Sequence, residues 1–125
     1  MKYLKILACM AGSLVLGQAL AAPIFIDVGE NCSKTVVDSI TDRPCRGGDA
    51  CRHRGELVNW VVRPGNYAFQ VEFAGQSPFG DATSCLTETG QPCRIPQSTQ
   101  DGNYEYNVSV DVPGCGMIDP KIVIN

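Results

Sequence analysis

The clearest pattern in the chain is an alternation of apolar and polar residues near its C-terminal end. In residues 104–112 every even position is apolar and every odd position is polar. Successive side chains of a β-strand point to opposite faces, so this period of two predicts a strand with one buried face and one solvated face. Residues 67–73 alternate in the same way, from Tyr67 to Phe73, and predict a second strand of this kind.

A third strand is predicted by an apolar run with a turn behind it. Residues 57–62 are almost continuously apolar around Trp60, which suggests a more central position in a sheet. The sequence Pro64-Gly65-Asn66 that follows is typical of a turn. We therefore expect a β-hairpin from about residue 56 to residue 73.

Two short apolar segments, residues 23–28 and 122–125, predict strands near the two ends of this domain. The loops between strands are dense in glycine, proline and cysteine, and residues 33–40 predict no more than a short turn. No stretch shows a convincing helical stripe. Many short strands separated by turn signals predict an all-β fold, a two-sheet β-sandwich in one domain.

The first 21 residues have the order of a secretory signal. A basic start leads into an apolar run at residues 6–16, and small residues follow up to Ala21. The apolar run is shorter than the roughly 20 residues that span a bilayer. We therefore predict cleavage after Ala21 and a mature domain of residues 22–125, located in the periplasm or secreted.

The charge balance of this domain excludes one class of partner. The 10 basic residues of the chain include Lys2 and Lys5, which precede the predicted cleavage site, whereas all 13 acidic residues follow it. An acidic domain without a basic stripe binds nucleic acid poorly, because neutralisation of phosphates supplies most of that affinity. The chain after the predicted signal contains no second apolar segment that would predict a membrane span.

Six cysteines follow the predicted signal, and an even number in a short exported chain predicts three disulfides. Six cysteines allow fifteen pairings. Short loops close most easily, which favours Cys45 with Cys51 and Cys85 with Cys93. Exclusion then leaves Cys32 with Cys115.

The C-terminal third resembles a known family. GNYEYNV at residues 102–108 and GMIDPKIVI at residues 116–124 are similar to the closing strands of cupredoxins. In that family a strand of the form Y-x-Y-x-C-x-x-H leads through a short loop to G-M and a final strand. The resemblance implies a Greek-key β-sandwich stapled here by about three disulfides, of the exported bacterial type.

The same resemblance implies that the copper site of the family is missing. Copper-binding cupredoxins use a cysteine thiolate, two histidines and a weakly bound methionine. In this chain the cysteine position falls on Val108, the second histidine position falls on Asp111, and Met117 lies near the methionine position. The earlier histidine is absent from the strand after the Pro64 turn, because the chain has a single histidine, His53. We expect no bound metal and no cofactor.

Catalytic residue types are also scarce. A Ser-His-Asp or Cys-His arrangement would have to use His53, and the cysteines it needs are expected to be in disulfides. The C-x-x-C pairs of zinc and thiol-redox sites do not occur. We therefore expect a protein that acts by binding and is not an enzyme.

The most distinctive loop, residues 43–54, carries four arginines and the histidine. A Cys45–Cys51 disulfide would hold it as a rigid protrusion, and its arginines suit an acidic protein or envelope component. The predicted binding residues are Arg46, Arg52, His53 and Arg54, with Phe79 in a second loop. We expect alanine at Arg46 and Arg52 to leave stability within about 0.5 kcal/mol, as for ordinary surface positions.

Three alternatives remain open from the sequence. The arginines of the loop could be solvated and paired with nearby carboxylates. The chain could be a copper-binding or electron-transfer cupredoxin with an unusual site. It could also be a periplasmic inhibitor or immunity-type protein, which would share the architecture and differ only in its partner.

Overall fold

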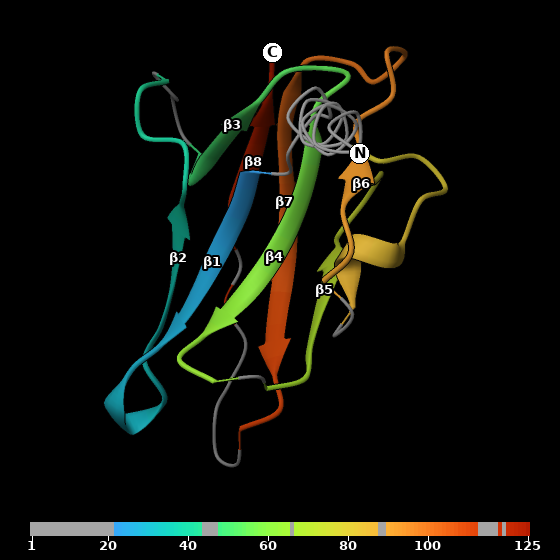
Figure 1. Ribbon diagram of the computed structural model, residues 1–125. Coiled ribbons are helices and arrows are strands. Elements are labelled where there is room, and N and C mark those ends of the chain that lie inside the picture. Colours follow the sequence, from blue (N-terminus) through green and yellow to red (C-terminus); the bar gives the residue numbers. More distant parts are fainter. Residues whose placement is uncertain (1–21, 44–47, 66, 88–89, 113–117, 119) are drawn as a thin grey trace, which may run out of the picture.

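The computed structural model describes residues 22–43, 48–65, 67–87, 90–112, 118 and 120–125, and it contains two four-stranded mixed sheets (Figure 1). The first sheet has the order β2-β1-β4-β6, and the second has the order β3-β8-β7-β5. The strands of the first sheet are β1 (Ala22–Val28), β2 (Lys34–Asp38), β4 (Leu57–Arg63) and β6 (Cys93–Arg94). Those of the second are β3 (Ala50–Arg52), β5 (Phe69–Phe73), β7 (Gly102–Val110) and β8 (Lys121–Ile124).

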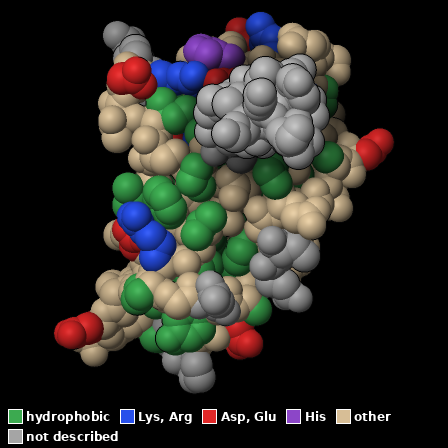
Figure 2. Space-filling model, in the orientation of Figure 1, with side chains coloured by type: hydrophobic (Ala, Val, Ile, Leu, Met, Phe, Trp, Pro, Cys, Tyr) green, Lys and Arg blue, Asp and Glu red, His purple; other side chains and the backbone are tan. Residues whose placement is uncertain are grey.

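The expected all-β class is confirmed. The helical elements of the described residues are two single 3₁₀ turns, η1 (Glu30–Cys32) and η2 (Ser84–Leu86). Within this part of the chain, no helix has the length and apolar character needed to cross a membrane. Figure 1 shows the first sheet in front of the second, and Figure 2 presents the outer face of the first sheet in the same orientation.

The sheets are mixed because two pairs of neighbouring strands run parallel. β1 lies between β2, to which it is antiparallel, and β4, to which it is parallel. In the second sheet β3 runs parallel to β8, while β7 is antiparallel to both β8 and β5. The segment at residues 34–38, expected to form no more than a turn, is an edge strand of the first sheet.

The predicted hairpin over residues 56–73 is wrong. β4 pairs with β1 and β6, whereas β5 pairs with β7 in the other sheet, so the Pro64 turn carries the chain across the sandwich. Both strands have a buried apolar face, and the two faces meet the same core from opposite sides. Alternation alone specifies the buried face of a strand but not the neighbour to which it is hydrogen-bonded.

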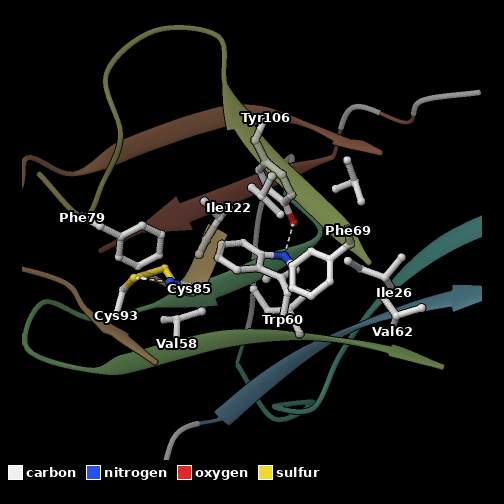
Figure 3. Packing of buried hydrophobic residues seen from close by; sticks show 14 of the residues in the cluster. Ile26, Val58, Trp60, Val62, Phe69, Phe79, Cys85, Cys93, Tyr106 and Ile122 are labelled. Carbon is white, nitrogen blue, oxygen red and sulfur yellow. Dashed lines mark hydrogen bonds between the residues drawn. A yellow bond between two sulfur atoms is a disulfide. The ribbon is translucent and has the colours of Figure 1, made fainter. Parts of the chain in front are cut away.

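The core lies between the two sheets and is centred on Trp60 (Figure 3). Trp60 on β4 is fully buried, and its Nε1 donates a hydrogen bond of 3.3 Å to the hydroxyl of Tyr106 on β7. The two rings also meet edge to face, with 5.4 Å between their centroids. Burial raises the pKa of the Tyr106 phenol far above its usual range. The predicted alternation of residues 104–110 is confirmed, since Tyr106, Val108 and Val110 point into this core.

Phe79, predicted to be a binding residue in a loop, belongs to the same core. Its ring is 1% exposed and contacts Trp60 edge to face, with 5.9 Å between centroids. It also packs against Phe73. Phe79 is therefore buried and not available at the surface for the predicted binding, because a large apolar side chain within reach of the core is more stable buried.

A buried ion pair connects the edges of the two sheets. Arg52 on β3 is fully buried and donates to both carboxylate oxygens of Asp38 on β2, at 2.8 Å each. The same guanidinium donates to the backbone carbonyl of Ala22 at 3.0 Å and to that of Cys51 at 2.7 Å. The expectation that Arg52 is a surface charge is wrong, because the N–H groups of its guanidinium donate to acceptors inside the protein.

The Cys85–Cys93 disulfide is confirmed, with 5.2 Å between the two Cα atoms. Cys32 and Cys51 are also disulfide-bonded. The predicted pairings of these two residues involve Cys115 and Cys45, which lie outside the described residues. The pairing of those four cysteines stays a prediction.

The ion pair predicts a large difference between two neighbouring arginines. Replacing Arg52 with alanine should destabilise the protein by about 3–5 kcal/mol, because Asp38 would lose its partner in a mostly buried position. Arg54→Ala is the matched control, since Arg54 pairs with Asp101 at the surface and such pairs contribute at most about 1 kcal/mol. Chemical denaturation of the two variants measures both changes. Equal small effects would contradict the structural role assigned to Arg52.

Candidate functional site

The arginine loop is the first place to look for a site, and the structure pairs its described charges internally. Arg43 donates to both oxygens of Glu56, at 2.6 and 2.7 Å, and Arg54 donates to Asp101 and to a backbone carbonyl. His53 is exposed, and its Nδ1 lies 3.4 Å from the carbonyl oxygen of Asn125. Arg46 lies outside the described residues, so its predicted role is untested.

Glu56 organises this loop as an acceptor. Besides Arg43, it accepts a hydrogen bond of 2.5 Å from the backbone N–H of His53. The Arg43 contact in particular lowers the pKa of the Glu56 carboxyl to about 2. Together with the Arg54–Asp101 pair, this favours the alternative in which the loop arginines pair with nearby carboxylates.

The resemblance to cupredoxins predicts ligand positions at Val108, Asp111 and Met117, of which Val108 lies within β7 and Asp111 directly follows it. Val108 is fully buried in the core and faces Val71 on the neighbouring strand. Asp111 is exposed, and its backbone N–H donates to the carbonyl of Ala68 at 2.7 Å. Met117 lies outside the described residues. Among those described, no three histidine, cysteine, aspartate or glutamate residues gather closely enough to hold a metal.

The strongest candidate site is on the outer face of the first sheet. Phe25 on β1 lies directly opposite Val37 on β2 and, on its other side, Val61 on β4. Val37 is 40% exposed and Val61 is 36% exposed. These three side chains form a line across three strands, which we call the apolar row.

A second line of residues runs beside the apolar row. Asp27 on β1 is opposite Thr35 on β2 and Arg63 on β4. Arg63 donates to both carboxylate oxygens of Asp27, at 2.5 and 2.8 Å, and its guanidinium carbon lies 3.8 Å from the centroid of the Phe25 ring. We call Thr35, Asp27 and Arg63 the charged row.

The contact between the two rows fixes the geometry of the face. The guanidinium of Arg63 both stacks on the ring of Phe25, a cation–π contact, and holds Asp27 in a fork. The bound guanidinium lowers the pKa of the Asp27 carboxyl, and the carboxylate raises the pKa of Arg63. Phe25 and Arg63 are thereby held in place by each other and by Asp27.

The strand pattern explains why these side chains point outward. Ile24 and Ile26 on β1 are fully buried, so Phe25 and Asp27 between them face the solvent. On β4 the buried Trp60 and Val62 flank Val61 in the same manner. Figure 2 shows hydrophobic side chains gathered over β2, β1 and β4, with basic and acidic side chains beside them.

Sequence reasoning missed this face, although a signal was present. A strand with one wet face alternates, whereas residues 23–26 and 60–62 are apolar without interruption. Such runs indicate strands with two apolar faces. The run around Trp60 predicts a central strand, which is correct for β4 but does not explain the exposure of Val61.

No protein-family model matches this chain, and no curated protein is similar enough to match it.

The Glu56 contacts predict a dependence of stability on pH. The pKa of Glu56 is lowered in the folded state, so its contribution to stability is present above the ordinary carboxyl pKa and is lost as the pH falls through about 2. Unfolding free energies of the natural protein and Glu56→Gln should therefore differ most at neutral pH, and the difference should shrink as the pH falls from about 4.5 to about 2. A difference that stays constant down to pH 2 would contradict this account of the carboxylate.

Proposed function

We propose that this chain is an exported, non-catalytic β-sandwich of cupredoxin-like type that binds another protein through the outer face of its first sheet. The observation that carries the proposal is the apolar row of Phe25, Val37 and Val61, set on an exposed sheet face. Contiguous exposed apolar surface rimmed by polar groups is typical of interaction sites. The fixed Arg63–Asp27 pair supplies that polar rim.

The cupredoxin-like part of the proposal has support from the strand arrangement. The two segments that resemble the family fall on β7 and β8, which pair with each other antiparallel. They stand in a sandwich of two four-stranded sheets, as the resemblance implies. A Greek-key connection of these strands is part of the proposal.

The charges of the face favour a partner with an apolar centre. Arg63 is neutralised by Asp27, and the described arginines of the loop are paired with carboxylates. Among the described residues, these pairs leave little free positive charge to attract an acidic partner at either place. We therefore favour the apolar row over the arginine loop as the docking surface, and an inhibitor or immunity-type role would use the same face.

A charge placed at the β4 end of the apolar row tests the proposal. Val61→Lys should leave the free energy of unfolding within about 0.5 kcal/mol, because position 61 is solvated. It should weaken partner binding at least about tenfold, because docking would remove water from an ammonium group. Tyr67→Lys is the matched control, since Tyr67 is 44% exposed and shortly precedes β5 of the second sheet.

The measurement has two stages. Partners are first captured from an envelope extract by the immobilised natural protein and both variants. Each captured partner is then purified, and its affinity for the three proteins is compared by calorimetry. A partner that binds Val61→Lys as tightly as it binds Tyr67→Lys would sink the proposed binding face.

A further inference from the structure

The edge strand β2 has a row of backbone groups that point away from its sheet. The N–H of Ser39 donates to Pro23 at 3.2 Å, and the N–H of Gly29 donates to Ser33 at 2.7 Å. These bonds lie at the two ends of the antiparallel β1–β2 ladder, so they fix which residues of β2 bond to β1. Thr35 and Val37 bond inward, and the N–H and C=O groups of Lys34, Val36 and Asp38 point outward.

The sequence of this edge is complementary to itself. Read antiparallel against a second copy and centred on Val36, the strand KTVVD places Lys34 opposite Asp38 of the second copy. Val36 then faces Val36, and Asp38 faces Lys34 of the second copy. The three outward-pointing residues become hydrogen-bonded pairs in this arrangement, and opposite charges stand across from each other at both ends.

Lys34 carries a charged group whose environment favours such a contact. Its Nζ is buried, and within the described part of the chain it has no hydrogen-bond partner. An inward-facing lysine on an edge strand ordinarily opposes pairing with another strand. In the pairing described above, Lys34 would meet Asp38 of the second copy. The two opposite charges would therefore attract each other.

Asp38 has room for a further donor. Its Oδ1 accepts from Arg52 and from the backbone N–H of Ile40, at 2.8 and 3.0 Å. Its Oδ2 accepts only from Arg52 among the described residues, at 2.8 Å. A carboxylate offers about four acceptor positions, so Oδ2 can accept an ammonium group without losing Arg52.

The register of the pairing is specific. A shift by one residue would direct the wrong backbone groups toward each other. A shift by two would place Lys34 opposite Val36 or Ile40 of the second copy and leave both charges without partners. One register therefore satisfies both the backbone and the charges.

We propose that the protein forms a symmetric dimer by antiparallel pairing of β2 with β2 of a second copy. The first sheets of the two copies then make one continuous sheet. On its outer face Val37 is opposite Thr35 of the second copy, so the apolar row of each copy continues as the charged row of the other. This dimer does not depend on the proposed binding function.

Strand pairing over five residues is a small interface, so the dimer should be weak and concentration-dependent. Sedimentation velocity of the purified protein over a range of concentrations measures it. Lys34→Glu should weaken dimerisation at least about tenfold, since two attractive pairs become repulsive. Lys121→Glu is the matched control, because it makes the same charge change in an exposed pair on β8 and should leave dimerisation unchanged.

Cysteine trapping tests the register. In the proposed pairing, residues 35 and 37 of different copies form a non-hydrogen-bonded pair with Cα atoms about 4.5 Å apart, within the range of a disulfide. Two copies of residue 37 lie on a diagonal about 7–8 Å apart, which is too far. A mixture of Thr35→Cys and Val37→Cys proteins should therefore form disulfide-linked dimers, and neither variant should do so alone.

Three results would overturn the proposal. A protein that stays monomeric at millimolar concentration has no such interface. Dimers that persist in Lys34→Glu use another surface, and linkage of Val37→Cys to itself shows another register. If β2 of a monomeric protein becomes protected from hydrogen exchange only when a different protein is added, the edge binds an extended segment of that protein and not a second copy.

Discussion

The architecture depends on the buried ion pair between Arg52 and Asp38. The two residues lie on edge strands of different sheets, β3 and β2, and the guanidinium also binds the first residue of β1. An arginine is taken out of water only where several acceptors replace the lost hydration, and four hydrogen bonds do so here. The pair therefore specifies how the two sheet edges align, which apolar contacts alone would leave variable.

The same constraint shapes both surfaces that carry our proposals. With Asp38 held toward the interior, the alternation of β2 places Val37 and Thr35 on the outer face of the first sheet. It also keeps β2 in the register with β1 that directs the backbone groups of Lys34, Val36 and Asp38 away from the sheet. The proposed binding face and the proposed dimer edge thus both follow from one strand orientation, although each has its own chemistry.

Sequence reasoning succeeded where structure is local. The alternation of residues 104–110 gave β7 and its buried face, and short-loop closure gave the Cys85–Cys93 bridge. It failed where distant segments decide the outcome. Arg52 is buried because acceptors on Asp38 and Ala22, distant in the sequence, bond to its guanidinium. β4 does not pair with β5 because β1 and β6 are hydrogen-bonded to its two sides. The apolar runs at residues 23–26 and 60–62 indicate strands with two apolar faces, but the alignment of Phe25, Val37 and Val61 in one row follows from the strand order.

Trp60 makes the contact between the sheets visible to spectroscopy. It is the only tryptophan of the chain, it is fully buried, and its indole N–H is bonded to Tyr106 across the interface of the two sheets. Any motion that separates the layers must break this bond and bring water to the indole. Its emission therefore reports on the integrity of the sandwich itself, and binding or self-association at the outer surface can be followed without disturbing that signal.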